Sequence, residues 1–148
     1  MINLIIIAAI ALVVAVSTGV LLWMRRRPRT IKADHFQAEW RQMQKLCKSK
    51  ETWAQAILDA DGLLDKALKK KRFSGKSMGE RLVSAQRLIN DNDGVWFGHK
   101  LRNKLHEDPT MKLKESDVKQ ALVGIRQAMK DLGALPSAKS EAQAKELK

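Results

Sequence analysis

Residues 4–23, LIIIAAIALVVAVSTGVLLW, form a run of twenty positions without a charged side chain. A helix rises 1.5 Å per residue, so this run is about 30 Å long and matches the hydrocarbon core of a bilayer. Trp23 closes the run, at the depth where interfacial tryptophans lie in membrane helices. The sequence therefore predicts a transmembrane anchor over residues 1–24.

Basic residues follow this run and do not precede it. A cleaved signal peptide carries its positive charge before the apolar run, so we expect an uncleaved anchor. A buried helix of a soluble protein is the alternative, but so short and charged a chain offers little to cover such a segment. The positive-inside rule places the basic linker 25–32 in the cytoplasm, with the N-terminus outside. The arginines of this linker are Arg25, Arg26, Arg27 and Arg29.

The net charge of +12 is unevenly spread along the chain. The four linker arginines and Lys32 contribute +5, residues 34–135 contribute +6, and residues 136–148 contribute +1. The juxtamembrane cluster is therefore expected to set topology and contact anionic lipid, which makes the bilayer a partner. A single cysteine, Cys47, excludes an intrachain disulfide and fits a reducing compartment.

Apolar residues recur at spacings of three and four through the rest of the chain, as in Trp53, Ile57 and Ala60. No segment alternates convincingly with period two, so we expect no sheet. Short loops predict antiparallel neighbours. The predicted fold is all-α: an N-terminal transmembrane helix followed by a small up-down helical bundle over 33–135. Its helices are expected near 33–48, 50–71, 77–90, 94–106 and 115–132.

Several helix ends are marked by capping signals. Ser77 and Glu80 fit a capping box, and the stretch 90–94, NDNDG, is typical of the next helix start. Gly133 suits the end of the last helix, and residues 136–148 hold too few apolar side chains to pack, so we expect a largely disordered tail. Helix 33–48 either extends the membrane helix or packs on the bundle, and Pro28 favours a break between them.

One stretch, HKLRNKLHE at 99–107, concentrates polar side chains with chemical potential. On a helix, His99, Arg102, Asn103 and His106 lie close to one face. A cation beside imidazoles can bind phosphate, and an imidazole can move a proton during metal-independent RNA cleavage. The structural alternative is that His106 stabilises the helix C-terminus while Arg102 pairs with Glu107 or with aspartates of 90–94.

This motif resembles the R-N-x-x-x-H signature of the HEPN superfamily (higher eukaryotes and prokaryotes nucleotide-binding). Those proteins are small helical bundles, often dimeric, and many are ribonucleases or toxin components. The chain also resembles single-pass membrane proteins of reduced-genome bacteria, which implies a bacterial inner membrane. The matching stretches are GKSMGERL at 75–82, HKLRNKLHE at 99–107 and DLGAL at 131–135.

The resemblance implies that Arg102 holds the scissile phosphate, His106 is the acid or base, and Asn103 orients them. It also implies a homodimer. The chain departs from the family pattern, because only three residues separate Arg102 from His106 where the family has at least four. One missing residue rotates His106 by about 100°, unless the helix unwinds near Glu107.

A basic run that could contact RNA or anionic lipid lies at the end of the helix expected at 50–71. It contains Lys69, Lys70, Lys71 and Arg72, with Lys76 beyond, although cations at a helix C-terminus also fit simple dipole chemistry. The three histidines and one cysteine lack metal-ligand spacing, so we predict no metal and no cofactor.

Three functions remain open from the sequence. The favoured one is a membrane-anchored HEPN-like interaction module that binds RNA or nucleotide through residues 99–107. The first alternative is a metal-independent endoribonuclease that uses Arg102 and His106. The second is a non-catalytic scaffold at the membrane.

Overall fold

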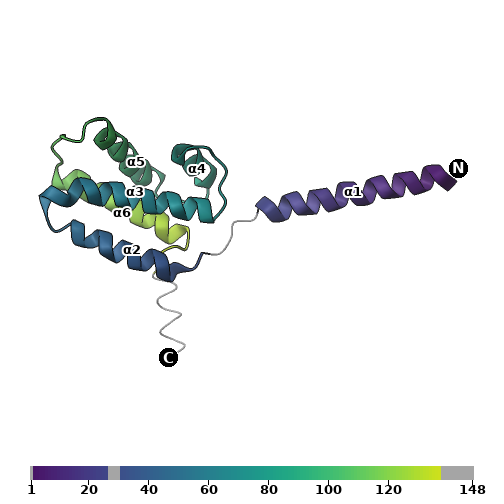
Figure 1. Cartoon of the computed structure of the whole chain (residues 1–148), viewed down its shortest axis with the longest axis horizontal. Helices are drawn as coiled ribbons and strands as arrows, with labels where there is room; N and C mark the ends of the chain where they lie inside the picture. The colour runs from purple at the N-terminus through teal and green to yellow at the C-terminus, as the bar shows by residue number, and fades with distance from the viewer. Residues whose placement is uncertain (1, 27–30, 138–148) are drawn as a thin grey trace, which may run out of the picture.

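The computed structural model describes residues 2–26 and 31–137, with side chains described for 6–23 and 31–137. Within these residues the regular structure is entirely helical, which confirms the all-α prediction. Figure 1 shows one long N-terminal helix, α1, standing apart from a bundle of α2 to α6. The segments 27–30 and 138–148 lie outside the described residues, and so do the predictions for Arg27, Arg29 and most of the tail.

Helix α1 runs from Ile2 to Arg26, and its stretch Ile6–Trp23 is long and apolar enough to cross a membrane. All side chains of this stretch are exposed, as an anchor in lipid requires. Its polar hydroxyls are satisfied within the helix, because those of Ser17 and Thr18 donate to the Val14 carbonyl at 3.0 and 2.8 Å. The side chains of Arg25 and Arg26 lie outside the described ones.

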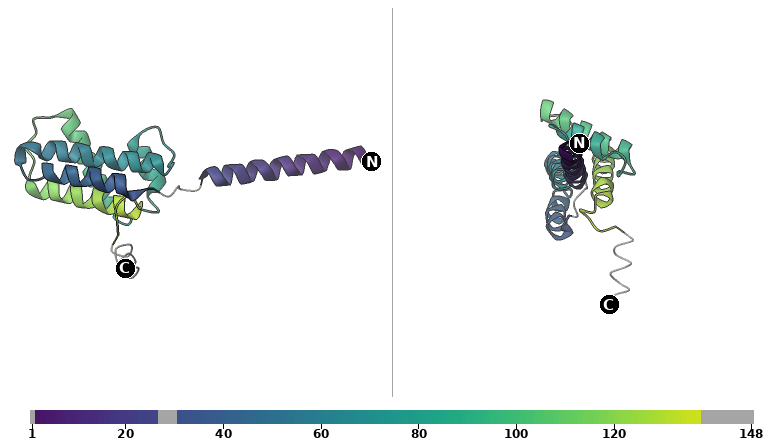
Figure 2. Two further views of the ribbon diagram at one scale, coloured as in Figure 1. Left: turned by 60° about the horizontal axis from the view of Figure 1, so that its bottom comes forward. Right: turned by 90° about the vertical axis from the view of Figure 1, so that its right-hand side faces the viewer.

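Helix α3 (Trp53–Lys70) is the centre of the bundle and contacts each of the other bundle helices. Small residues on its core face, Ala56, Ala60 and Ala67, are fully buried and allow close approach of its neighbours. The turns of the bundle place α2 and α3 antiparallel, as Figure 2 shows. The other helices are α2 (Ala33–Leu46), α4 (Met78–Ala85), α5 (Asn92–Glu107) and α6 (Glu115–Asp131), with a short 3-10 turn, η1, at Lys50–Thr52.

Helix α2 packs on the bundle and does not continue α1, which settles the open alternative for this segment. Its apolar stripe of Phe36, Trp40 and Met43 is at most 5% exposed and joins the main core. Burial of each such side chain contributes roughly 1.5–3 kcal/mol, so the stripe holds α2 firmly in place.

Helix α4 begins as predicted but ends earlier. The hydroxyl of Ser77 accepts from the Glu80 N–H at 3.2 Å, and the Glu80 carboxylate accepts from the Lys76 N–H at 2.7 Å. The helix stops at Ala85 and not at residue 90, and in the turn that follows the Asn92 side-chain amide donates to the carbonyls of Gln86 and Ile89. Those carbonyls are thereby capped, and the chain turns into α5.

Helices α5 and α6 make the closest pair in the bundle. A Cβ added to Gly124 of α6 would overlap the backbone of Gly94 on α5, so both backbones meet where no side chain fits. The Asp91 carboxylate caps α5 by accepting from the Gly94 N–H at 2.9 Å. Gly133, with φ of 72°, ends α6 as predicted, and the next N–H, of Ala134, donates to the Met129 carbonyl.

Candidate functional site

A polar pocket of about 520 Å³ opens between α3, α4 and α5. Helix α3 lines it with two aspartates, α5 lines it with the first half of the HKLRNKLHE motif, and α4 contributes its N-terminus. The polar side chains of this pocket are Asp61, Asp65, Ser77, Arg81, His99, Arg102 and Asn103.

The innermost contact joins His99 to Asp61. Nδ1 of His99 lies 3.0 Å from Oδ1 of Asp61, and their side chains are 11% and 4% exposed. The Asp61 carboxylate accepts a hydrogen bond from the Nδ1–H group, and Nε2 on the other side of the ring lies 3.5 Å from the side-chain nitrogen of Asn103. The rings of Trp96 and His99 pack edge to face with their centroids 5.9 Å apart, so the imidazole is held in one orientation.

Arg102 completes this group from the solvent side. Its Nε lies 3.6 Å from the second oxygen of Asp61, and its Nη1 donates to the Asn103 side-chain oxygen at 3.1 Å. The side chain remains 37% exposed. It therefore presents positive charge at the pocket opening while it contributes to the Asp61 network.

A second ion-pair group forms the other wall. Arg81, which is 7% exposed, donates to the Asp65 carboxylate at 2.8 Å and to the Gly75 carbonyl at 2.8 Å. Lys69 lies 2.7 Å from the other Asp65 oxygen. Burial alone would raise the pKa of Asp65, but the hydrogen bonds and charges of Lys69 and Arg81 outweigh it and lower the pKa below its ordinary value.

The N-terminus of α4 faces the same space. Ser77, Met78 and Gly79 all line the pocket, and the first N–H groups of a helix have no intrahelical acceptor. A Cβ added to Gly79 would lie 3.9 Å from Nε2 of His99, which is ordinary van der Waals contact, so the first turn of α4 lies directly beside the imidazole. The N-terminus of α4 therefore lies beside His99, and Arg102 lines the same pocket. The positive end of a helix dipole together with a guanidinium group attracts anions.

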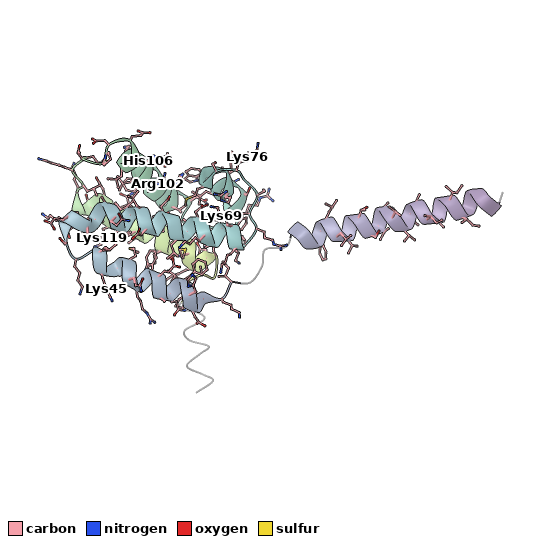
Figure 3. The ribbon with its side chains drawn as sticks, in the orientation of Figure 1. Lys45, Lys69, Lys76, Arg102, His106 and Lys119 are labelled. Atoms are coloured by element: carbon pink, nitrogen blue, oxygen red, sulfur yellow. The ribbon has the colours of Figure 1, made fainter. Side chains whose placement is uncertain are left out.

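The structure brings together three of the four motif residues. His99, Arg102 and Asn103 share the pocket, whereas His106 is exposed and does not line it. Helix α5 stays helical through Glu107, so no unwinding offsets the rotation caused by the shortened spacing. Figure 3 shows Arg102 and His106 on α5.

The sequence interpretation missed Asp61, which anchors the pocket. It named Glu107 or the aspartates of 90–94 as partners for Arg102, but the structure pairs Arg102 with Asp61. A signal was available in the periodicity. Asp61 lies four residues after Ile57 and three before Leu64, so it puts a carboxylate on the buried stripe of α3. No comparable signal in the sequence marked Asp65 or Arg81 as pocket residues.

The predicted basic run forms a turn at the end of α3. We call residues 69–76 the basic turn. Lys70 lies over the Phe36 ring, with Nζ 5.7 Å from the centroid, and Arg72 adopts a left-handed φ of 63°. Partial burial lowers the pKa of Lys71. None of these residues lines the pocket, and Lys69 is joined to its wall through the ion pair with Asp65.

No group of three or more metal-ligating His, Cys, Asp or Glu side chains occurs among the residues that the structure describes. Comparison of the chain with protein-family models, curated proteins and solved structures finds no match.

Proposed function

We propose that this chain is a membrane-anchored, HEPN-like helical module that binds a phosphate group of RNA or of a nucleotide in the polar pocket. The observation that supports the proposal is the convergence of Arg102, His99 and the α4 N-terminus on one opening. His99 and Arg102 both contact Asp61 of α3, so the positions of these two α5 side chains are set by contacts between helices.

The repulsion between the two pocket aspartates and an anionic ligand is offset by their cationic partners. Asp65 is held between Arg81 and Lys69, and Asp61 between His99 and Arg102. Since Arg102 is the more exposed member of its pair, a phosphate can approach its outer edge without displacing the Asp61 contact.

The proposal includes a location. We place α1 across the bacterial inner membrane, with the N-terminus outside and the bundle in the cytoplasm. The four arginines after the apolar run support this orientation through the positive-inside rule. The homodimer implied by the resemblance is part of the same proposal.

Two other functions make different demands on the site. Cleavage by Arg102 and His106 needs both side chains at one phosphate, and the exposure of His106 outside the pocket weighs against it. A scaffold needs only the network itself, and the complete pairing of Asp61 and Asp65 favours that reading as second candidate.

The test is binding of a dye-labelled single-stranded RNA by the full chain in detergent micelles, followed by fluorescence anisotropy and competed with AMP. We expect Arg102→Gln to weaken binding by about 10-fold or more, because a charge-assisted hydrogen bond contributes roughly 1.5–3 kcal/mol. Lys112→Gln, an exposed lysine beyond α5, is the matched control and should change affinity little.

Three outcomes separate the functions. If the parent and Arg102→Gln bind RNA with the same affinity, and also bind AMP with the same affinity, the binding proposal is overturned. RNA cleavage in EDTA that His106→Ala abolishes would establish the ribonuclease. Absence of both behaviours, combined with a lower melting temperature for Arg102→Gln, would support the scaffold.

A further inference from the structure

A second charged surface lies at the end of the bundle where α2 begins and α3 ends. The basic turn, residues 69–76, carries five basic and no acidic side chains. Lys69 is paired with Asp65, whereas Lys70, Arg72 and Lys76 are exposed. These three cations form a surface that the pocket does not use.

Contacts between α2 and α3 fix this surface beside the start of α2. Lys70 lies over Phe36 in the first turn of α2, and Lys66 lies 2.9 Å from Glu39 one turn later. The other end of the bundle holds the α2–α3 turn and the start of α6, since Cys47, Trp53 and Glu115 line one groove. Figure 3 shows Lys69 and Lys76 at the first end and Lys119 at the other.

The backbone of the basic turn is braced and not left to fold on a ligand. Arg81 donates to the Gly75 carbonyl at 2.8 Å, and the Ser84 hydroxyl donates to the Ser74 carbonyl at 2.7 Å. The N–H of Phe73 donates to the Leu68 carbonyl at 3.1 Å. The backbone that carries the exposed cations therefore keeps a fixed position relative to α2.

The chain length after α1 limits how far this end lies from a membrane. Helix α1 ends at Arg26 and α2 begins at Ala33, so six residues join them. Even fully extended, such a connection reaches at most about 25 Å. If α1 spans a bilayer, the start of α2 and the basic turn beside it stay close to the membrane surface. The far end of α2 can lie roughly 20 Å further away.

We propose that the basic turn binds the anionic phospholipid headgroups of the bilayer that α1 crosses, and so fixes the orientation of the bundle on the membrane. This inference rests on the membrane insertion proposed above and is independent of the pocket ligand. Lysines and arginines near an anionic leaflet are attracted to it within a Debye length, about 8 Å at physiological salt.

The aromatic side chains near the basic turn favour lipid over RNA as its partner. Single-stranded RNA is commonly bound by base stacking on exposed aromatic faces. Phe36 is 1% exposed, and Phe73 packs against the main core, so neither offers such a face. Headgroup phosphates require only exposed positive charge, which Lys70, Arg72 and Lys76 provide.

The test uses energy transfer from a dye on the full chain to acceptor-labelled lipid headgroups in nanodiscs. The discs contain phosphatidylcholine alone or with roughly one-third phosphatidylglycerol, an anionic lipid. In a Cys47→Ser background, the dye is placed at Ser74→Cys in the basic turn or at Thr110→Cys between α5 and α6. The test variant is Lys70→Gln/Arg72→Gln/Lys76→Gln, and the matched control is Lys112→Gln/Lys114→Gln/Lys119→Gln, three exposed lysines at the other end.

We expect transfer from residue 74 to be greater in discs with phosphatidylglycerol than in neutral discs, with residue 110 showing no such gain. The test variant should lose this gain and the control should keep it, with helical circular dichroism unchanged in both. High salt should also remove the gain. Equal transfer in both lipids, or a gain that the test variant retains, would overturn the proposal.

Two companion measurements separate the remaining explanations. A test variant that keeps its lipid-dependent transfer but loses affinity for labelled RNA would assign the basic turn to RNA and overturn the lipid proposal. Extraction of the full chain from vesicles at alkaline pH would show that α1 is not inserted, which overturns the tether itself. The pocket variant Arg102→Gln should leave every one of these membrane readouts unchanged.

Discussion

The imidazole Nδ1 of His99 lies 3.0 Å from Oδ1 of Asp61, a residue 38 positions earlier in the chain. This contact ties α5 to the central helix α3 through two side chains that are almost fully buried. The same carboxylate lies 3.6 Å from Nε of Arg102. One aspartate therefore both joins two helices and sets the position of the groups that we assign to ligand binding.

Replacement of Asp61 should be costly to stability. Asp61→Ala removes the acceptor that His99 and Arg102 share and leaves the buried Nδ1–H of His99 unpaired, which costs about 1–3 kcal/mol. Thermal unfolding of the full chain in detergent micelles, followed by tryptophan fluorescence, measures the effect. Asp59→Ala, on the exposed face of α3, is the control and should cost less than about 1 kcal/mol. Equal melting temperatures for both variants would contradict the assigned role of Asp61.

Arg81 and Lys69 share one carboxylate but should differ strongly in what they contribute. Arg81 is 7% exposed and also holds the Gly75 carbonyl, so Arg81→Gln should lower the free energy of unfolding by about 2–3 kcal/mol. The side chain of Lys69 is 60% exposed, and Lys69→Gln should cost at most about 1 kcal/mol. Chemical denaturation of the two variants side by side gives the comparison, and a larger loss in Lys69→Gln would refute it.

Stability should fall in acid partly through Asp65. The pKa of Asp65 is lower in the folded chain than in the unfolded chain. In the unfolded chain an aspartate carboxyl has a pKa of about 3.9. The folded state is therefore favoured above that pH, and this contribution is lost as pH falls from about 4 through the lower folded value. Melting temperatures measured from neutral pH into acid should decline less steeply in Asp65→Asn than in the parent. Parallel curves would show that Asp65 does not contribute.

Replacement of a bundle glycine by alanine should raise or lower stability according to the space around that glycine. Gly124→Ala would force the new methyl group into the backbone of Gly94, so we expect a loss of about 3 kcal/mol and weaker packing of α5 on α6. Gly62 is also helical, but a Cβ there meets nothing within 4 Å, so Gly62→Ala should stabilise α3 by roughly 0.5–1 kcal/mol. Thermal melts of both variants test this prediction, which requires a lower melting temperature for Gly124→Ala and a higher one for Gly62→Ala than for the parent.

Local sequence patterns predicted most of the helical framework. Apolar spacing of three and four located four of the five bundle helices, and the turn signal at 90–94 located the start of α5. Capping residues such as Ser77 and Gly133 marked ends that the structure confirms. These features depend on neighbours within one or two turns, which the sequence displays directly. The early end of α4 was missed, and the turn that replaces its predicted last residues is held by the Asn92 side chain, which donates to the carbonyls of Gln86 and Ile89.

The sequence by itself determined a long apolar helix, a set of amphipathic helices, and the placing of His99, Arg102 and Asn103 near one face of α5. Tertiary structure alone decided that Asp61 would meet that face and that His106 would lie outside the pocket. The physical reason is that periodicity shows which side of a helix is buried but not which helix covers it. That choice depends on how α3, α4 and α5 pack, including backbone contacts such as Gly124 against Gly94, whose partners lie 30 positions apart.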